Sequence, residues 1–172
     1  SGRWRIEPEE LGPHDHMVLE TASGHVLALC DPRRFGSVDL VATDSLEQWP
    51  QFAAMGPEPL GEALTARHLK TALAGRSAAI KLMLLDQRIV AGLGNIYVCE
   101  ALHRSGLHPE MPAGALARLG PEPENRADRL AGHIRDILHE ALQSGGSTLR
   151  DFAHADGSLG YFQHAFRVYD RE

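Results

Sequence analysis

The segment at residues 87–109, QRIVAGLGNIYVCEALHRSGLHP, constrains the fold of this chain more than any other. A short apolar run at 89–91 leads into a glycine-rich turn at 92–94, and Asn95 opens a helical pattern that Gly106 ends. Glycine lets the backbone approach a ligand closely, and asparagine is a favourable N-cap residue. Because the first N–H groups of a helix suit a phosphate, the segment predicts a phosphate-binding turn; a plain helix-initiating turn is the alternative.

Two observations bear on which phosphate such a turn would bind. The turn lacks the third glycine of a dinucleotide fingerprint, and no second strand ending in an acidic residue follows it. A phosphate of a nucleic-acid backbone therefore fits better than a nucleotide. The net charge of −6 argues mildly against a nucleic-acid partner. Residues 61–105, however, carry six lysines or arginines against three carboxylates, a local balance of +3 that is compatible with phosphate contacts.

Residues 1–56 are predicted to form β-structure and the rest of the chain to be helical. Strands are expected at 17–21, 25–30 and 38–43, with a hairpin turn at Ser23-Gly24 between the first two. The proline- and glycine-rich connector at 56–61 marks the predicted boundary between a domain at 1–56 and a domain at 57–172. The pattern predicts an α+β fold.

Helix signals recur through the predicted second domain. Thr65 is expected to cap a helix that runs to Leu73, and Ser77 to cap a second helix with apolar residues nearly all round, which should be buried. Apolar residues at helical spacing predict a long amphipathic helix at 125–143. A loop with a short helical piece is expected at 112–124, and a final strand at 161–169.

Cysteine content and hydropathy indicate the compartment in which the protein is expected and whether it contacts a membrane. Cys30 and Cys99 are the only cysteines, and they lie far apart in the sequence, so neither a disulfide framework nor a zinc motif is recognisable. No apolar run approaches the ~18 residues that a membrane helix needs. We therefore expect a protein of the cytoplasm, where thiols stay reduced, with no membrane contact.

The loop DPRRFG at 31–36 places two arginines and an aromatic residue between predicted strands. An exposed Phe35 beside the guanidinium of Arg33 could wedge between bases and take the place of an extruded base. In the alternative interpretation, the loop is a simple turn and Phe35 packs into the core.

Three other features allow more than one interpretation. His14 and His16 are two positions apart, so they share a face in an extended strand and could bind a metal, donate to a phosphate or lie on the surface; no further ligand is visible. Arg76 and Lys81 flank the start of the second predicted helix, where Lys81 either extends to solvent or points into a site. The polar segment at 147–162 could close over a ligand or be an ordinary surface loop. No nucleophile–base set is recognisable.

Four motifs, taken in order, resemble formamidopyrimidine-DNA glycosylase, the bacterial enzyme that excises 8-oxoguanine and ring-opened purines. They are DPRRFG at 31–36, GPEPL at 56–60, AIKLMLLDQRIVAGLGNIYVCEALHRSGLHP at 79–109 and GGSTLRDF…DGSLGYF at 145–162. The resemblance covers nearly the whole chain. It implies the last strands of an N-terminal β-sandwich, then a helix–two-turn–helix domain, and double-stranded DNA with oxidised purines as the partner.

The resemblance also implies roles for individual residues in the DNA complex. His14, Arg76 and Asn95 match residues that contact DNA phosphates, and Lys81 matches a position near the damaged base. These implied roles favour a DNA-binding function over a purely structural role at each of these positions.

Further implied roles concern the damaged base itself. Arg33 matches the arginine that enters the gap opposite the flipped lesion, and Phe35 matches the wedge beside it. The loop that contains Ser147, Thr148 and Tyr161 matches the loop that closes over the extruded base.

The resemblance is incomplete at both ends of the chain. The family's chemistry begins at an N-terminal proline that attacks the sugar, assisted by a glutamate and a lysine, and it ends in β,δ-elimination at the abasic site. This chain opens at Ser1-Gly2, which resembles a point just past that region, and stops at Glu172, where a four-cysteine zinc finger would begin. The parent is expected to be a monomeric, nucleoid-associated glycosylase and abasic-site lyase with one structural zinc. This central fragment is expected to be inactive, without catalytic residues, metal or cofactor.

Two other interpretations stay open. The chain could be a stand-alone, non-catalytic DNA-binding module, or, on weaker grounds, a nucleotide-binding domain built on the glycine turn.

Overall fold

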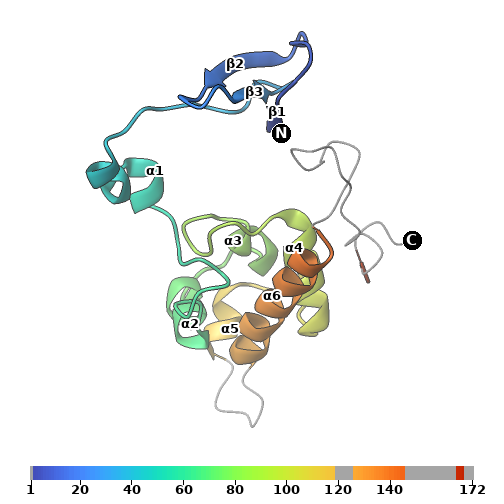
Figure 1. Cartoon of the computed structure of the whole chain (residues 1–172). Coiled ribbons are helices and arrows are strands. Elements are labelled where there is room, and N and C mark those ends of the chain that lie inside the picture. Colours follow the sequence, from blue (N-terminus) through green and yellow to red (C-terminus); the bar gives the residue numbers. More distant parts are fainter. Residues whose placement is uncertain (1, 119–125, 146–165, 169–172) are drawn as a thin grey trace. The chain divides into compact units, whose positions relative to one another are not determined.

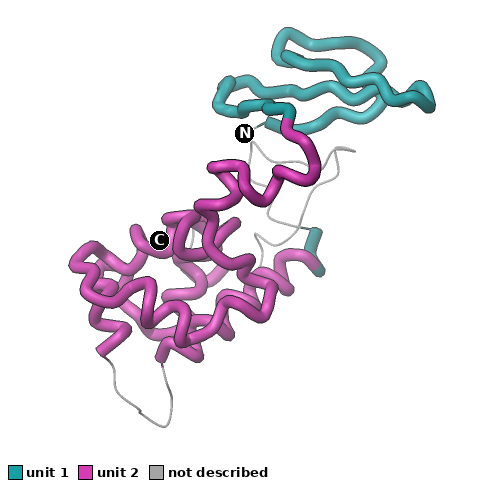
Figure 2. The backbone as a smooth tube through the Cα atoms, turned by 90° about the vertical axis from the view of Figure 1, so that its left-hand side faces the viewer, with its two compact units in different colours: residues 1–40, 143–165 teal, residues 41–142, 166–172 magenta. Residues whose placement is uncertain are grey.

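The computed structural model describes residues 2–118, 126–145 and 166–168, and the chain divides into two compact units (Figure 1; Figure 2). Unit 1 contains Ser1–Leu40 with Gln143–Ala165, and unit 2 contains Val41–Leu142 with Phe166–Glu172. Compact packing thus divides the chain after Leu40. The domain boundary expected at residue 56 stays a prediction, because packing units and inherited domains need not share a boundary.

Unit 1 is built on a three-stranded antiparallel sheet of β1 (Arg3–Ile6), β2 (Asp15–Glu20) and β3 (Val26–Cys30). The strand order is β1-β3-β2, so β3 lies in the middle. The hairpin predicted for residues 17–21 and 25–30 is confirmed as β2 and β3. Gly24 in its turn has a φ of +84°, a conformation that favours glycine.

The strand expected at 38–43 is wrong, and β1 takes its place. Both edges of β3 are already paired, one with β1 and one with β2, so no edge of β3 is left for residues 38–43. Leu40 is fully exposed. The strand at β1 escaped prediction because its alternation of polar and apolar residues is only four residues long, the lower limit at which alternation indicates a strand. The Arg5 guanidinium forms an ion pair with Asp15.

The expectation that residues 1–56 form only β-structure is also wrong at 43–53. A 3₁₀ helix, η1 (Thr43–Gln48), is followed by the single-turn helix α1 (Pro50–Ala53). Proline at the first helical position explains the start of α1, because its missing N–H would have no intrahelical partner there.

Five further helices lie in the described part of the chain, four of them wholly in unit 2 and the last ending one residue beyond Leu142, and Figure 1 labels them. They are α2 (Ala66–Leu73), α3 (Ile80–Leu84), α4 (Asn95–Arg104), α5 (Gly114–Arg118) and α6 (Arg126–Gln143). The prediction for α2 is confirmed: the Thr65 hydroxyl accepts the N–H of His68 at 3.1 Å, and Gly75 follows with a φ of +71°. The long amphipathic helix and the short helical piece are confirmed as α6 and α5.

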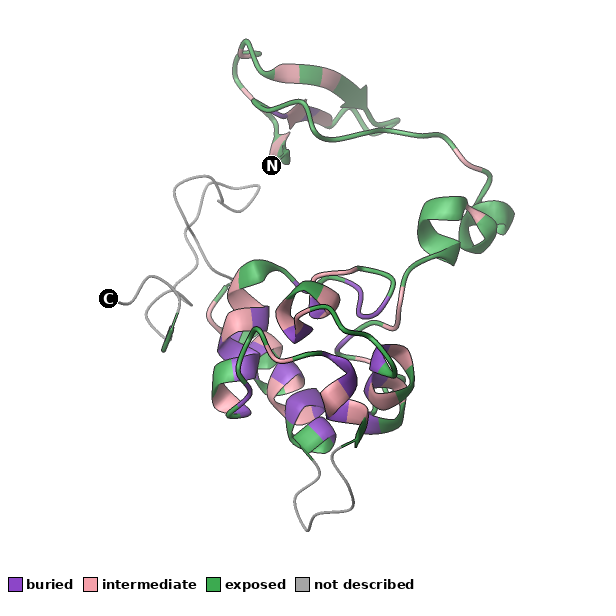
Figure 3. Cartoon of the chain, turned by 180° about the vertical axis from the view of Figure 1, so that it is seen from behind, coloured by how far each residue is buried: buried purple, intermediate pink, exposed green. Residues whose placement is uncertain are grey.

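The core of unit 2 is aliphatic and is shared by its helices and connections (Figure 3). The largest fully buried side chains of the described residues are Leu64, Leu69, Leu73, Ile80, Leu84, Leu93, Leu102, Leu116, Leu130, Ile134 and Ile137. Burial of this apolar surface is the main source of stability for the unit.

The second predicted helix is shorter and more exposed than expected. It begins at Ile80 rather than after Ser77, because the preceding residues run antiparallel to 111–114. Ile80 donates its N–H to the Met111 carbonyl at 2.8 Å, and Ala113 donates to Ala78 at 2.9 Å. The expectation of burial on all sides is wrong, since Leu82 is 63% exposed.

A buried carboxylate ties the segment 166–168 to α4. Glu100 is completely buried and accepts the N–H of Arg167 at 3.0 and 2.9 Å and that of Val168 at 2.9 Å. Residues 166–168 are not in a strand, and the rest of the strand expected at 161–169 lies outside the described residues. Within the described part of the chain, no helix combines the length and apolarity needed to cross a membrane.

Candidate functional site

The glycine turn at 92–94 leads into α4, and its backbone conformation places the first residue of that helix at the surface. Gly92 has a φ of +72°, and Gly94 is the N-cap of α4. Leu93 between them is buried, whereas both glycines are exposed. One side chain thus anchors the turn in the core while its backbone and the start of α4 face outward.

Asn95 is the first residue of α4 and not its N-cap, so that part of the prediction is wrong. Glycine is an acceptable N-cap, and its use leaves the Asn95 amide available outside the helix. Asn95 is exposed, and its Oδ1 accepts a long hydrogen bond of 3.7 Å from the thiol of Cys99. The first N–H groups of an α-helix have no intrahelical acceptor, so an exposed amide stands here beside an anion-binding helix end.

Gln87 is a residue of this site that sequence analysis missed. Its Oε1 accepts the N–H of Gly92 at 2.7 Å, and its Nε2 donates to the carbonyls of Leu85 at 3.1 Å and Leu93 at 3.0 Å. The side chain therefore spans the loop that leads into the turn. A glutamine five positions before a glycine carries no recognisable signal in a single sequence.

Several charged side chains lie on the segments that precede the turn in the sequence. Arg88 forms a fork on Asp86, with Nη2–Oδ2 at 2.7 Å, and this guanidinium is the main cause that lowers the pKa of Asp86 to about 2; the charge of Arg76 lowers it further. Arg76 is exposed, and its backbone carbonyl accepts the N–H of Gly114 at 2.8 Å. Lys81 is half-buried in α3, and its role stays a prediction.

The loop at 31–36 in unit 1 presents its aromatic residue to solvent. Phe35 is 84% exposed, which excludes the alternative in which it packs into the core. The guanidinium carbon of Arg33 lies 5.5 Å from the centre of the Phe35 ring, within cation–π range. Arg34, between them, has a φ of +54°, an uncommon conformation for a residue with a side chain.

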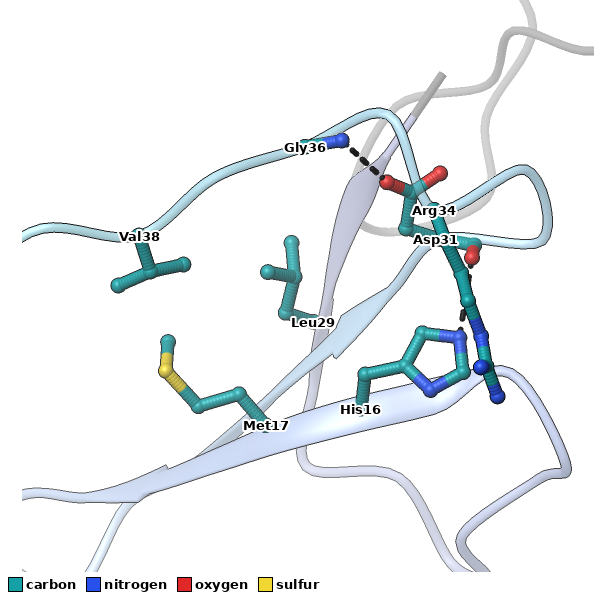
Figure 4. A pocket seen from close by; sticks show the side chains of 7 residues that line it. All are labelled: His16, Met17, Leu29, Asp31, Arg34, Gly36 and Val38. Carbon is teal, nitrogen blue, oxygen red and sulfur yellow. Dashed lines mark hydrogen bonds between the residues drawn. The ribbon is translucent and has the colours of Figure 1, made fainter.

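Asp31 holds this loop in place from the sheet side. Its side chain is nearly buried, and Oδ2 accepts the N–H of Gly36 at 2.7 Å, closing the loop (Figure 4). Its backbone carbonyl accepts the N–H of Arg34 at 3.2 Å and Nε2–H of His16 at 3.0 Å. The pKa of Asp31 is lowered, chiefly by the Gly36 N–H bond.

An open pocket of about 550 Å³ lies under the loop, lined by His16, Met17, Leu29, Asp31, Arg34, Gly36 and Val38 (Figure 4). The rings of His14 and His16 lie edge to face with centroids 6.5 Å apart. No group of three His, Cys, Asp or Glu side chains that could hold a metal ion occurs among the described residues. Ser147, Thr148 and Tyr161 of the predicted lesion loop lie outside the described residues.

We expect the loop at 31–36 to lose its closure in acid. Because the pKa of Asp31 in the folded chain lies below its ordinary value of 3.8, the contribution of its carboxylate is complete above that value and is lost as the pH falls through the lowered pKa. An NMR titration should show the Gly36 amide moving together with the Asp31 carboxyl. In Asp31→Asn this coupled step should disappear; a Gly36 amide that titrates identically in both proteins would contradict the assignment.

Comparison with known proteins relates the chain to formamidopyrimidine-DNA glycosylases. The family model described as Formamidopyrimidine-DNA glycosylase H2TH domain matches residues 55–153. Formamidopyrimidine-DNA glycosylase of Novosphingobium aromaticivorans is 60% identical over 172 residues, which are 100% of this chain and 62% of the relative. The same protein of Rhizorhabdus wittichii is also 60% identical, with the same shares covered. The chain thus spans less than two thirds of the length of these relatives.

Solved structures agree with these relatives. MutM (Fpg) of Thermus thermophilus is 39% identical with a TM-score of 0.85, over 99% of this chain and 61% of that chain. Lactococcus lactis Fpg in complex with DNA containing an abasic site is 32% identical with a TM-score of 0.82, over 98% of this chain and 60% of that chain. These similarities confirm the α+β class with a helix–two-turn–helix domain and the resemblance that the sequence motifs carry.

Proposed function

The chain belongs to the formamidopyrimidine-DNA glycosylase family, and from this premise we propose that it binds damaged duplex DNA as part of a base-excision repair glycosylase. The observation that carries the proposal is the exposed start of α4. There Asn95 follows a glycine turn whose Gly92 N–H is bound by the side chain of Gln87. A helix end of this kind suits a backbone phosphate. A solved relative in complex with abasic-site DNA supports it.

In the proposed complex, phosphate contacts and base contacts come from different parts of the chain. Asn95 and Arg76 bind backbone phosphates and fix the register of the duplex, as does His14, while Lys81 lies near the damaged base. These contacts carry no sequence information of their own. The local positive balance of residues 61–105 is compatible with these phosphate contacts.

Phe35 and Arg33 are the proposed agents of base extrusion. An exposed aromatic ring can unstack a base step, and the guanidinium beside it can occupy the space that an extruded base leaves. The exposure of Phe35 and the closure of its loop by Asp31 support this role, because a wedge must hold its shape against the stacked duplex. Ser147, Thr148 and Tyr161 are proposed to close over the extruded base.

For the whole protein we propose excision of oxidised purines, 8-oxoguanine and formamidopyrimidine, followed by β,δ-elimination at the abasic site. A complex of Lactococcus lactis Fpg with Fapy-dG-containing DNA supports this substrate class. The inactivity of this chain by itself, the structural zinc of the longer protein, its monomeric state and its place in the cytoplasm stay predictions.

The test of the proposal is Asn95→Ala in a duplex-binding titration. We expect affinity to fall about fivefold, by the same factor for an 8-oxoguanine duplex and for plain DNA, because a phosphate contact does not read the base. Binding of the wild-type chain should weaken as salt rises. The salt slope should not change in Asn95→Ala, since a neutral amide displaces no counterion. Fluorescence anisotropy at several salt concentrations measures both quantities.

Thr71→Ala is the matched control, because Thr71 is a neutral, exposed residue of α2. It should bind both duplexes like the wild-type chain. Equal affinity of Asn95→Ala and wild type would overturn the phosphate role of Asn95. A chain that binds a mononucleotide but no duplex would overturn the proposed function and favour the nucleotide-binding alternative.

A further inference from the structure

Both ends of the Gln87 side-chain amide form backbone hydrogen bonds around the glycine turn. It accepts the N–H of Gly92 at 2.7 Å and donates both to Leu85, the C-cap of α3, at 3.1 Å and to Leu93 at 3.0 Å. One side chain thus connects the end of α3 to both sides of Gly92. Three hydrogen bonds of ordinary length from one amide fix the relative positions of these backbone groups.

The backbone of Gln87 is fixed as well, which makes its amide a rigid support. Its carbonyl accepts the N–H of Gly56 at 2.8 Å. Residues 89–91, which follow the exposed Arg88, are buried, and the Ile89 carbonyl accepts Nε2–H of His68 at 2.7 Å. The Gln87 side chain is itself exposed, so the support it gives to the exposed turn comes from a side chain at the surface whose backbone is held by the packed segment beside it.

Packing of the buried Leu93 side chain does not by itself fix the orientation of the exposed residues of the turn. Leu93 is its buried anchor, but Gly92, Gly94 and Asn95 are exposed, and glycine backbone has wide conformational freedom. Without the amide of Gln87, the N–H of Gly92 would have to turn to water, and the residues before α4 could rotate about Leu93. The position of Asn95 depends on that rotation, because it comes directly after Gly94.

We propose that Gln87 is a positioning residue for phosphate binding: by closing the turn onto Gly92 and Leu93, it holds the start of α4 and Asn95 in the orientation that a DNA phosphate requires. The inference rests on the proposed function of this site. Gln87 acts through the turn and touches no ligand itself. A residue of this kind is needed where two glycines precede a binding helix end, since a loosely held site loses binding free energy to ordering.

Gln87→Met tests the inference, because methionine has a similar length and offers none of the three hydrogen bonds. We expect duplex affinity to fall about fivefold with an unchanged salt slope, the same signature as Asn95→Ala. In Gln87→Met/Asn95→Ala, the loss should be smaller than the product of the two single losses, because the second change removes a contact that the first has already weakened. Gln51→Met, at an exposed glutamine of α1, is the control and should bind like wild type.

The outcomes separate this inference from the proposed function. Should the wild-type chain bind no duplex, both fail. Should Asn95→Ala weaken binding while Gln87→Met binds like wild type, or should the two losses multiply, only the positioning role of Gln87 fails. Hydrogen exchange of the free chain gives a second readout: the Gly92 amide should exchange about tenfold faster in Gln87→Met, and an unchanged rate would overturn the inference without any DNA in the experiment.

Discussion

Glu100→Ala is expected to lower the free energy of unfolding of unit 2 by about 3 kcal/mol. The Glu100 carboxylate is completely buried and accepts the N–H groups of Arg167 and Val168 at 2.9–3.0 Å. Hydrogen bonds to a charged group are worth more than neutral ones, and truncation to alanine also leaves a cavity. Urea unfolding followed by circular dichroism measures the change.

Two variants sharpen this result. Glu110→Ala removes an exposed carboxylate and should shift the free energy of unfolding by no more than about 0.5 kcal/mol. Glu100→Gln keeps the size of the side chain and one acceptor oxygen, and should fall between Glu100→Ala and wild type. If Glu100→Ala unfolds at the urea concentration of the wild-type chain, the segment 166–168 adds no stability to α4.

Helices with a clear start and stop were predictable from the sequence. Thr65 and Gly75 bound α2, and Gly106 ends α4 with a φ of +63°, because cap chemistry and the freedom of glycine act locally. The start of α3 was not predictable in this way. Its first turn competes with pairing to residues 111–114, a contact that comes from the other side of α4 in the sequence.

The sheet shows the same division between local and long-range causes. The hairpin of β2 and β3 follows from a turn signal and two apolar runs. The choice of β1 over residues 38–43 as the third strand depends on which segment reaches the free edge of β3, and no local pattern decides that. The alternation of polar and apolar residues in β1 extends over only four positions, and the charge of Arg5 is paired with Asp15 only in the folded sheet.

The candidate site was predictable where residues face outward and not where they support others. Phe35 was identified because an aromatic residue on a polar loop is unusual in sequence, and Asn95 because asparagine after a glycine turn is a common signal of a helix start. Gln87 and Glu100 were missed because both act by hydrogen bonds to backbone groups, which nearly every residue offers. For Glu100 the partners lie 67 and 68 positions away, beyond the reach of any spacing rule.

Gly56→Ala is expected to destabilise unit 2 by about 2 kcal/mol and to weaken duplex binding as well. A Cβ at this position would lie 2.6 Å from the carbonyl carbon and oxygen of Ile89 and 2.8 Å from the carbonyl oxygen of Arg88. These are backbone atoms and cannot rotate away, so the connector or the segment 87–91 must shift. A shift of that segment moves the Gln87 support of the turn.

Gly61→Ala is the matched control, because it lies in the same connector and its added Cβ would meet only ordinary contacts, the nearest being the Glu58 carbonyl oxygen at 3.4 Å. It should leave both stability and duplex binding near wild type. Equal urea midpoints for the two variants would contradict the close approach of Gly56 to Ile89. If Gly56→Ala loses stability but keeps full duplex affinity, the shift is taken up by the connector. The glycine of GPEPL then serves packing, and the turn before α4 is positioned from Gln87 onward without it.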